Sequence, residues 1–81
     1  MKRRFDYNYY FNSDDYRICF EYGITKADIE RTIRVYINAN NICKEDSYLI
    51  DFNDNIEVDF SIVDITECEY TIEVDNLYLI D

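Results

Sequence analysis

From residue 47 onward, apolar and polar side chains alternate with a period of two, which is typical of β-strands that bury one face. The pattern divides into three apolar series, and we predict one strand for each. The series are Tyr48, Ile50 and Phe52; Ile56, Val58, Phe60 and Ile62; and Cys68, Tyr70, Ile72 and Val74. Residues 53–55 and 64–67 are the predicted connections. Asp75 and Asn76 are predicted to form a two-residue hairpin turn before a last strand at residues 77–80.

The N-terminal part alternates in the same way, which predicts a first β-hairpin over residues 5–22. Its two apolar series are Phe5, Tyr7, Tyr9 and Phe11, and then Tyr16, Ile18, Phe20 and Tyr22. Residues 12–15 between them are Asn, Ser and Asp, which favour turns because their short polar side chains bond the nearby backbone. Gly23 is expected to mark the end of the second strand.

Residues 25–40 have the period of an amphipathic helix. Thr25 is the predicted N-cap, and Asp28 stands in capping-box position. The side chains expected to face the sheet are Ile29, Ile33, Tyr36 and Ile37; those expected on the outer side are Arg31 and Arg34, and Asn40 and Asn41 can end the helix in a left-handed conformation. The element order is therefore ββαββββ. It predicts a single α+β domain over residues 1–81, with a mainly antiparallel sheet of about five to six strands and one helix packed on it.

Charge is distributed unevenly along the 81 residues, and this changes the picture of the sheet. The chain has a net charge of −10, yet residues 1–44 contain all eight bases and only six of the 18 acids. Residues 45–81 contain twelve acids and no base. The acidic half coincides with the predicted C-terminal strands, so the strand surface must be strongly negative.

The alternation assigns the acids of the predicted strands to the face opposite the helix. The residues expected there are Glu57, Asp59, Ser61, Glu69, Thr71 and Glu73. Depending on the loop length, either Glu57 or Asp59 lies opposite Glu73 in the predicted register. Like charges in direct opposition destabilise a sheet by a few tenths to about 1 kcal/mol per pair. One explanation is that a partner supplies the missing cations; the other is that the charge only maintains solubility and protects sheet edges from pairing.

Several kinds of site are disfavoured by the sequence. Asp51, Asn53, Asn55, Glu57 and Asp59 have the alternate spacing of an EF-hand loop, but Ile56 replaces the glycine and Ile62 the final glutamate. Zinc is disfavoured because there is no histidine and no Cys-x-x-Cys. We therefore expect no metal and no cofactor. With one glycine and no proline, the chain offers little loop structure for an active site, so we expect no enzyme. Direct nucleic-acid binding is disfavoured by the net negative charge.

Cysteine usage and hydropathy predict the compartment. Three cysteines are too few for a disulfide framework, and no signal peptide or apolar run of membrane-spanning length is present, so we expect a cytoplasmic protein. By strand parity, Cys19 is expected to be exposed and Cys68 to lie in the core.

In length, charge and lack of catalytic motifs, the chain resembles small acidic phage-encoded inhibitors, namely anti-CRISPR proteins and DNA-mimic anti-restriction proteins. The residues that carry the resemblance are Asp51, Asp54, Glu57, Asp59, Asp64, Glu67, Glu69, Glu73 and Asp75. The resemblance implies a phage- or mobile-element-encoded protein acting stoichiometrically in the cytoplasm of a bacterial host. In that role its acidic face would block the positively charged nucleic-acid groove of a CRISPR effector.

Two other functions fit the same residues. An immunity protein or antitoxin that neutralises a basic nuclease toxin would use the same charge complementarity. An acidic dimerising module could instead use an open edge strand, for which residues 77–80 are the candidate.

Overall fold

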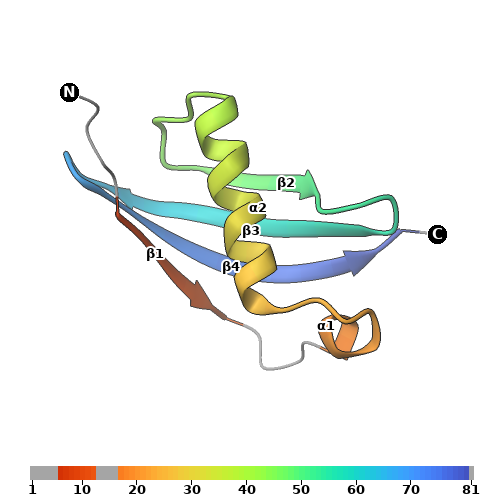
Figure 1. Ribbon diagram of the computed structural model, residues 1–81. Helices are drawn as coiled ribbons and strands as arrows, with labels where there is room; N and C mark the ends of the chain where they lie inside the picture. Colours follow the sequence, from red (N-terminus) through yellow and green to blue (C-terminus); the bar gives the residue numbers. More distant parts are fainter. Residues whose placement is uncertain (1–5, 13–16, 81) are drawn as a thin grey trace.

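The computed structural model describes residues 6–12 and 17–80 of the chain, which form an α+β fold (Figure 1). The elements in chain order are β1 (Asp6–Phe11), α1 (Arg17–Glu21), α2 (Lys26–Ala39), β2 (Ser47–Asp51), β3 (Ile56–Ile65) and β4 (Glu69–Leu79). The four strands form one sheet in the order β1-β4-β3-β2. Pairing is parallel between β1 and β4 and antiparallel elsewhere. The prediction of an α+β fold is confirmed, but the predicted strand count and order are wrong, and the sheet is mixed.

The predicted N-terminal hairpin is wrong because its second half is the short helix α1. The five residues of α1 are too few to distinguish a strand from a helix by periodicity. Gly23 ends the helix with φ 66°, and the N–H of Ile24 donates to the carbonyl of Cys19 at 2.8 Å, as in a Schellman motif. The glycine therefore caps a helix instead of ending a strand. Residues 5 and 13–16 of the predicted hairpin lie outside the described residues.

The predicted hairpin turn at Asp75 and Asn76 is also wrong, because β4 continues through both residues. The register places Asp59 opposite Asn76 and Phe60 opposite Val74, so Asp75 is the extra residue of a β-bulge. The bulge therefore lies at Asp75 and Asn76, the two residues whose types had predicted a turn. Residues 77–79 thus lengthen β4, and among the described strands none pairs with them on the side of β1.

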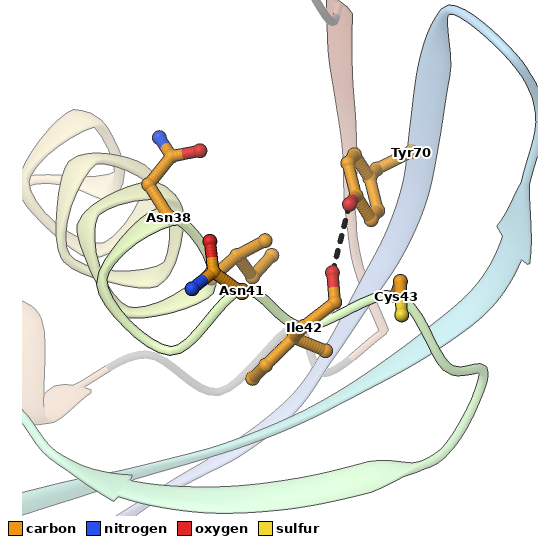
Figure 2. A pocket seen from close by; sticks show the side chains of 6 residues that line it. Asn38, Asn41, Ile42, Cys43 and Tyr70 are labelled. Atoms are coloured by element: carbon orange, nitrogen blue, oxygen red, sulfur yellow. Dashed lines mark hydrogen bonds between the residues drawn. The ribbon is translucent and has the colours of Figure 1, made fainter.

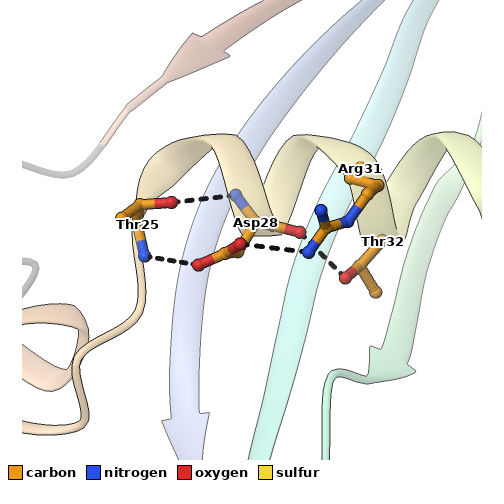
Figure 3. A network of polar contacts seen from close by, with 4 residues as sticks. All are labelled: Thr25, Asp28, Arg31 and Thr32. Carbon is orange, nitrogen blue, oxygen red and sulfur yellow. Dashed lines mark hydrogen bonds and ion pairs between the residues drawn. The ribbon is translucent and has the colours of Figure 1, made fainter.

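Helix α2 confirms the prediction for residues 25–40, including its first turn. The backbone N–H of Thr25 donates to the Asp28 carboxylate at 3.0 Å, and the N–H of Asp28 donates to the Thr25 hydroxyl at 3.2 Å (Figure 3). Hydrogen bonding to the carboxylate itself, mainly from the Thr25 backbone N–H and secondly from the Thr25 side chain, lowers the pKa of the Asp28 carboxyl. Arg31 adds an ion pair with Asp28 at 3.1 Å. At the other end Asn41 is left-handed with φ 50° as predicted, whereas Asn40 has φ −106°.

The core lies between α2 and one face of the sheet, which α2 crosses in Figure 1. The helix contributes three buried side chains, Ile29, Ile33 and Ile37. The sheet contributes the apolar series of β3 and β4, among which Val58, Phe60, Ile72 and Val74 are 0% exposed. Partly buried tyrosines pack against the margins of the core. One of them also bonds α2, because the hydroxyl of Tyr9 donates to the Glu30 carbonyl at 3.0 Å.

The burial predicted for two cysteines from strand alternation is wrong. Cys19 is buried instead of exposed, because it lies on α1 and points into the core cluster. Cys68 is exposed instead of buried, because it lies in the turn between β3 and β4, where alternation no longer applies.

Candidate functional site

The face of the sheet opposite α2 carries most of the chemistry of this molecule, and we call it the open face. Both helices place their buried side chains in the core on the other face, so neither helix covers the open face. Eight carboxylates belong to the open face by strand alternation and register, and we call them the face carboxylates. They are Asp6 on β1, Asp51 on β2, Glu57, Asp59 and Asp64 on β3, and Glu69, Glu73 and Asp75 on β4.

Seven of the nine residues singled out in the sequence are face carboxylates. The other two, Asp54 and Glu67, lie in the exposed turns that flank β3 at its two ends. Asp6 was not among the residues predicted from the sequence, although the alternation of the N-terminal series already placed it on the other face of the strand from Tyr7 and Tyr9. What the sequence did not show is that β1 pairs with β4, which brings Asp6 directly opposite Glu69.

The predicted opposition of like charges between β3 and β4 is wrong. Glu57 lies opposite Tyr78, Asp59 opposite Asn76, and Glu73 opposite Ser61. Strand β3 continues to Ile65, and two register shifts interrupt the ladder, so neither predicted register applies. The structure separates the carboxylates of the two central strands by neutral side chains.

Carboxylates do lie opposite each other at the two outer pairings of the sheet. Asp51 on the edge strand β2 lies opposite Glu57, and Asp6 on the edge strand β1 lies opposite Glu69. Glu69 accepts a hydrogen bond from the amide of Asn8 at 3.2 Å. Among the described residues, no base comes within ion-pair distance of any face carboxylate. The repulsion predicted for the sheet is therefore present, but at its edges instead of its centre.

Neutral donors hold the carboxylates near the middle of the sheet. The Asn12 amide donates to Glu73 and to Asp75 at 2.8 Å each, and the Ser61 hydroxyl donates to Asp75 at 2.8 Å. Ser47 on β2 contacts the Ser61 hydroxyl at 3.1 Å. The network thus links β2, β3, β4 and the end of β1. Amide and hydroxyl donors satisfy carboxylate oxygens without removing their charge, so the face stays negative.

Exposed apolar and aromatic side chains interrupt the acids on the open face. Tyr10 and Leu49 are 57% and 56% exposed, and Val63 and Tyr78 are each 43% exposed. Tyrosine provides contact area and a hydroxyl at low entropic cost, which is why it is frequent in protein interfaces. The open face therefore combines charge with side chains that can pack against a partner.

Apart from the open face, a pocket of about 290 Å³ lies at the C-terminal end of α2. Its polar groups are Asn38, Asn41, Cys43 and Tyr70, and the Tyr70 hydroxyl donates to the Ile42 carbonyl at 2.8 Å (Figure 2). Burial raises the pKa of the Tyr70 hydroxyl, so it remains a donor at neutral pH. Because its hydroxyl already bonds the backbone, Tyr70 acts here as a support for the loop after α2.

Within residues 6–12 and 17–80, no three His, Cys, Asp or Glu side chains come together in a way that could hold a metal ion. Neither α1 nor α2 has the length and apolar character of a membrane span.

Comparison with known proteins identifies no similar protein. No protein-family model matches the chain, and comparison with curated proteins and with solved structures found no match. The function has to be inferred from the surfaces themselves.

Proposed function

We propose that this protein is a stoichiometric, anti-CRISPR-like inhibitor whose open face blocks the positively charged nucleic-acid groove of a CRISPR effector. The observation that carries the proposal is the gathering of eight carboxylates on one sheet face that neither described helix covers, with no base among the described residues beside them. A sheet that only needed solubility would gain from a lysine opposite an acid, whereas Asp51 lies opposite Glu57 instead.

The spacing of the face carboxylates supports mimicry of a phosphate backbone. Alternate residues of a strand repeat at about 6.6–6.8 Å, and neighbouring strands lie about 4.8 Å apart. The phosphates of one DNA strand advance about 3.4 Å per nucleotide. Neutral side chains such as Ser61 and Thr71 interrupt the acids of β3 and β4. Their six carboxylates along the ten residues of β3, about 33 Å, give roughly one charge per 5 to 6 Å, which is somewhat over half the density of a single phosphate chain. A groove lined with Lys and Arg would release counterions on binding such a surface, as it does on binding DNA.

The two alternative functions are separated by the partner and by the surface used. A basic nuclease toxin would meet the same open face, so the immunity-protein alternative differs only in the identity of the partner. A dimerising module would use a strand edge, and the face carboxylates would then have no partner to neutralise them.

The test compares two variants of equal charge. The face variant carries Glu57→Gln, Asp59→Asn and Glu73→Gln. The off-face variant carries Glu21→Gln, Glu30→Gln and Glu45→Gln, all outside the strands. Each tagged protein is used to capture a CRISPR effector from a bacterial lysate, with and without guide RNA, and is then tested for inhibition of target-DNA cleavage.

The proposal expects capture and inhibition by the wild type and the off-face variant, and loss of both in the face variant. Equal inhibition by all three proteins would exclude the open face as the interface. Capture of a nuclease toxin instead of a CRISPR effector would support the immunity-protein alternative.

A further inference from the structure

Strand β2 forms one edge of the sheet, and half of its backbone groups point away from β3. The carbonyl of Asp46 and the N–H of Phe52, at either end of the strand, each bond β3 at 2.8 Å. Hydrogen-bonded and non-hydrogen-bonded pairs alternate along an antiparallel ladder. Even-numbered residues of β2 therefore bond β3, and Ser47, Leu49 and Asp51 direct their N–H and C=O groups outward.

The outward groups differ along the strand. The N–H of Ser47 is already capped by the side chain of Asp46, which accepts its hydrogen bond at 2.8 Å. Among the described residues, nothing bonds the outward N–H and C=O of Leu49 or of Asp51. The middle and the end of β2 thus offer a short row of unused donors and acceptors, which is the template for adding a further strand.

A groove of about 510 Å³ runs along this edge, lined by Tyr36, Leu49, Ile50, Asp51 and Glu57. Its two sides differ in chemistry. Tyr36 from α2 and the buried Ile50 form an apolar wall on the helix side of the sheet, whereas Asp51 and Glu57 form an acidic wall on the open face. Leu49, which is 56% exposed, adds an apolar contact on the acidic side.

We propose that the β2 edge binds an extended segment of a basic partner as an added strand, in which apolar and basic residues alternate. The alternate side chains of a strand point to opposite faces. In an added strand, one set would reach Tyr36 and Ile50, and the other set would reach the two opposed carboxylates Asp51 and Glu57. The inference rests on the proposed function in requiring a basic partner, but it places the contact at the edge and not across the open face.

A second copy of this chain fits the edge poorly. Two β2 strands pairing antiparallel about Leu49 would set Asp51 opposite Ser47, next to Asp46 of the other copy. Residues 45–81 contain no base that could neutralise these acids. A basic segment removes the repulsion between Asp51 and Glu57, whereas a second copy adds to it.

The probe is a short synthetic peptide in which lysine and valine alternate, added to ¹⁵N-labelled protein and followed by NMR. The control peptide has the same sequence with every second backbone nitrogen methylated, which keeps the charge but removes one row of donors. We expect binding of the first peptide with shifts at the amides of Leu49 and Asp51 and slowed hydrogen exchange at both. The methylated peptide should bind roughly tenfold or more weakly.

Two protein variants locate the binding. Leu49→Pro removes an N–H that the fold does not use and should abolish the exchange protection of the Asp51 amide, while Leu49→Ala should retain it. Asp51→Asn, which leaves the backbone unchanged, should weaken binding and reduce its salt dependence.

Three results would overturn the edge inference: equal affinity for both peptides, shifts confined to the surroundings of Glu73 and Asp75, or no binding at about 1 mM peptide. A two-site variant, Asp59→Asn with Glu73→Gln, separates this test from the proposed function, because neither residue lines the groove, whereas Glu57 does. If the open face is the interface but the edge is not, the two-site variant loses inhibition while Leu49→Pro retains it.

Discussion

The two faces of this sheet are made by alternate residues of the same strands, yet one face is apolar and buried and the other is polar and acidic. On the covered face, Val58, Phe60, Ile72 and Val74 are fully buried against α2. On the open face, the residues between them are mostly half-buried acids and hydroxyls, joined by hydrogen bonds from neutral donors, and the exposed side chains of Tyr10, Leu49 and Tyr78 lie on the same face. One face has the chemistry of a core, and the other has the chemistry of an interface.

The covered face supplies most of the stability of the fold. Burial of apolar side chains stabilises by roughly 25 cal/mol per Å² removed from water, so the covered face supplies most of the stabilisation. The open face contributes hydrogen bonds of about 1 kcal/mol each and loses part of that gain to repulsion between Asp51 and Glu57 and between Asp6 and Glu69. A surface that lowers the stability of the free protein is understandable if a partner compensates its charge.

The largest expected effect is on the covered face. Phe60→Ala should lower the free energy of unfolding by about 3–5 kcal/mol, because it removes a fully buried ring and leaves a cavity. Ser61→Ala, at the next residue on the opposite face, should cost about 1 kcal/mol or less. Urea unfolding followed by circular dichroism measures both. If Phe60→Ala does not fold, Phe60→Leu serves as the smaller truncation. Similar losses for Phe60 and Ser61 would contradict the contrast between the faces.

Side chains of the covered face should also cause the free energy of unfolding to fall at alkaline pH. Burial raises the pKa of the hydroxyls of Tyr9, Tyr48 and Tyr70 and of the Cys19 thiol. A raised folded-state pKa stabilises the fold fully below the unfolded pKa, and this stabilisation is lost as pH rises through the folded pKa. For the tyrosines, stability should therefore fall above about pH 10. Urea midpoints measured across alkaline pH test this, and Tyr9→Phe should flatten the decline.

On the open face, Asn12 is the substitution with the largest expected effect. Asn12→Ala removes the amide that donates to Glu73 and Asp75 and should cost about 1 kcal/mol. Asn12→Asp should cost more, because it places a third carboxylate beside the first two. The extra cost should shrink when salt screens the charges, which thermal unfolding at two salt concentrations would detect. A salt-independent difference between the two variants would indicate a cause other than repulsion.

The smallest expected effect has the opposite sign. Glu57→Gln removes the like-charge opposition to Asp51 and should raise the free energy of unfolding by a few tenths to about 1 kcal/mol. The gain should decline with added salt. A matched control is Glu45→Gln, which lies outside the strands and should leave stability within about 0.5 kcal/mol. Destabilisation by Glu57→Gln would show that this carboxylate is stabilising in the free protein.

How far the sequence could predict these two faces depends on the element. The helix over residues 25–40 was predictable because its period, its Thr25 and Asp28 capping box and its left-handed Asn41 all agree. Alternation also placed the buried and outward residues of β3 and β4 correctly. These signals are local, and they concern which side of an element is buried.

Pairing could not be predicted, because it depends on contacts between distant residues. Nothing near Asp6 indicates that β1 pairs in parallel with β4, more than sixty residues later. The bulge at Asp75 and the continuation of β3 to Ile65 shifted the register away from both predicted alternatives. The short segment at residues 17–21, apolar only at its three central positions, was ambiguous between helix and strand, and Gly23 was the signal that could have favoured a helix end.

The central claim is that the open face, and not the total charge, binds a basic partner. The most direct measurement is the affinity of the wild type, the face variant and the off-face variant for a guide-loaded CRISPR effector, at about 50 mM and about 200 mM salt. We predict that wild-type and off-face affinities fall steeply with salt, and that the face variant binds at least roughly tenfold more weakly with a shallower salt dependence. Affinities that do not depend on salt, or that fall equally in both variants, would contradict binding through the open face.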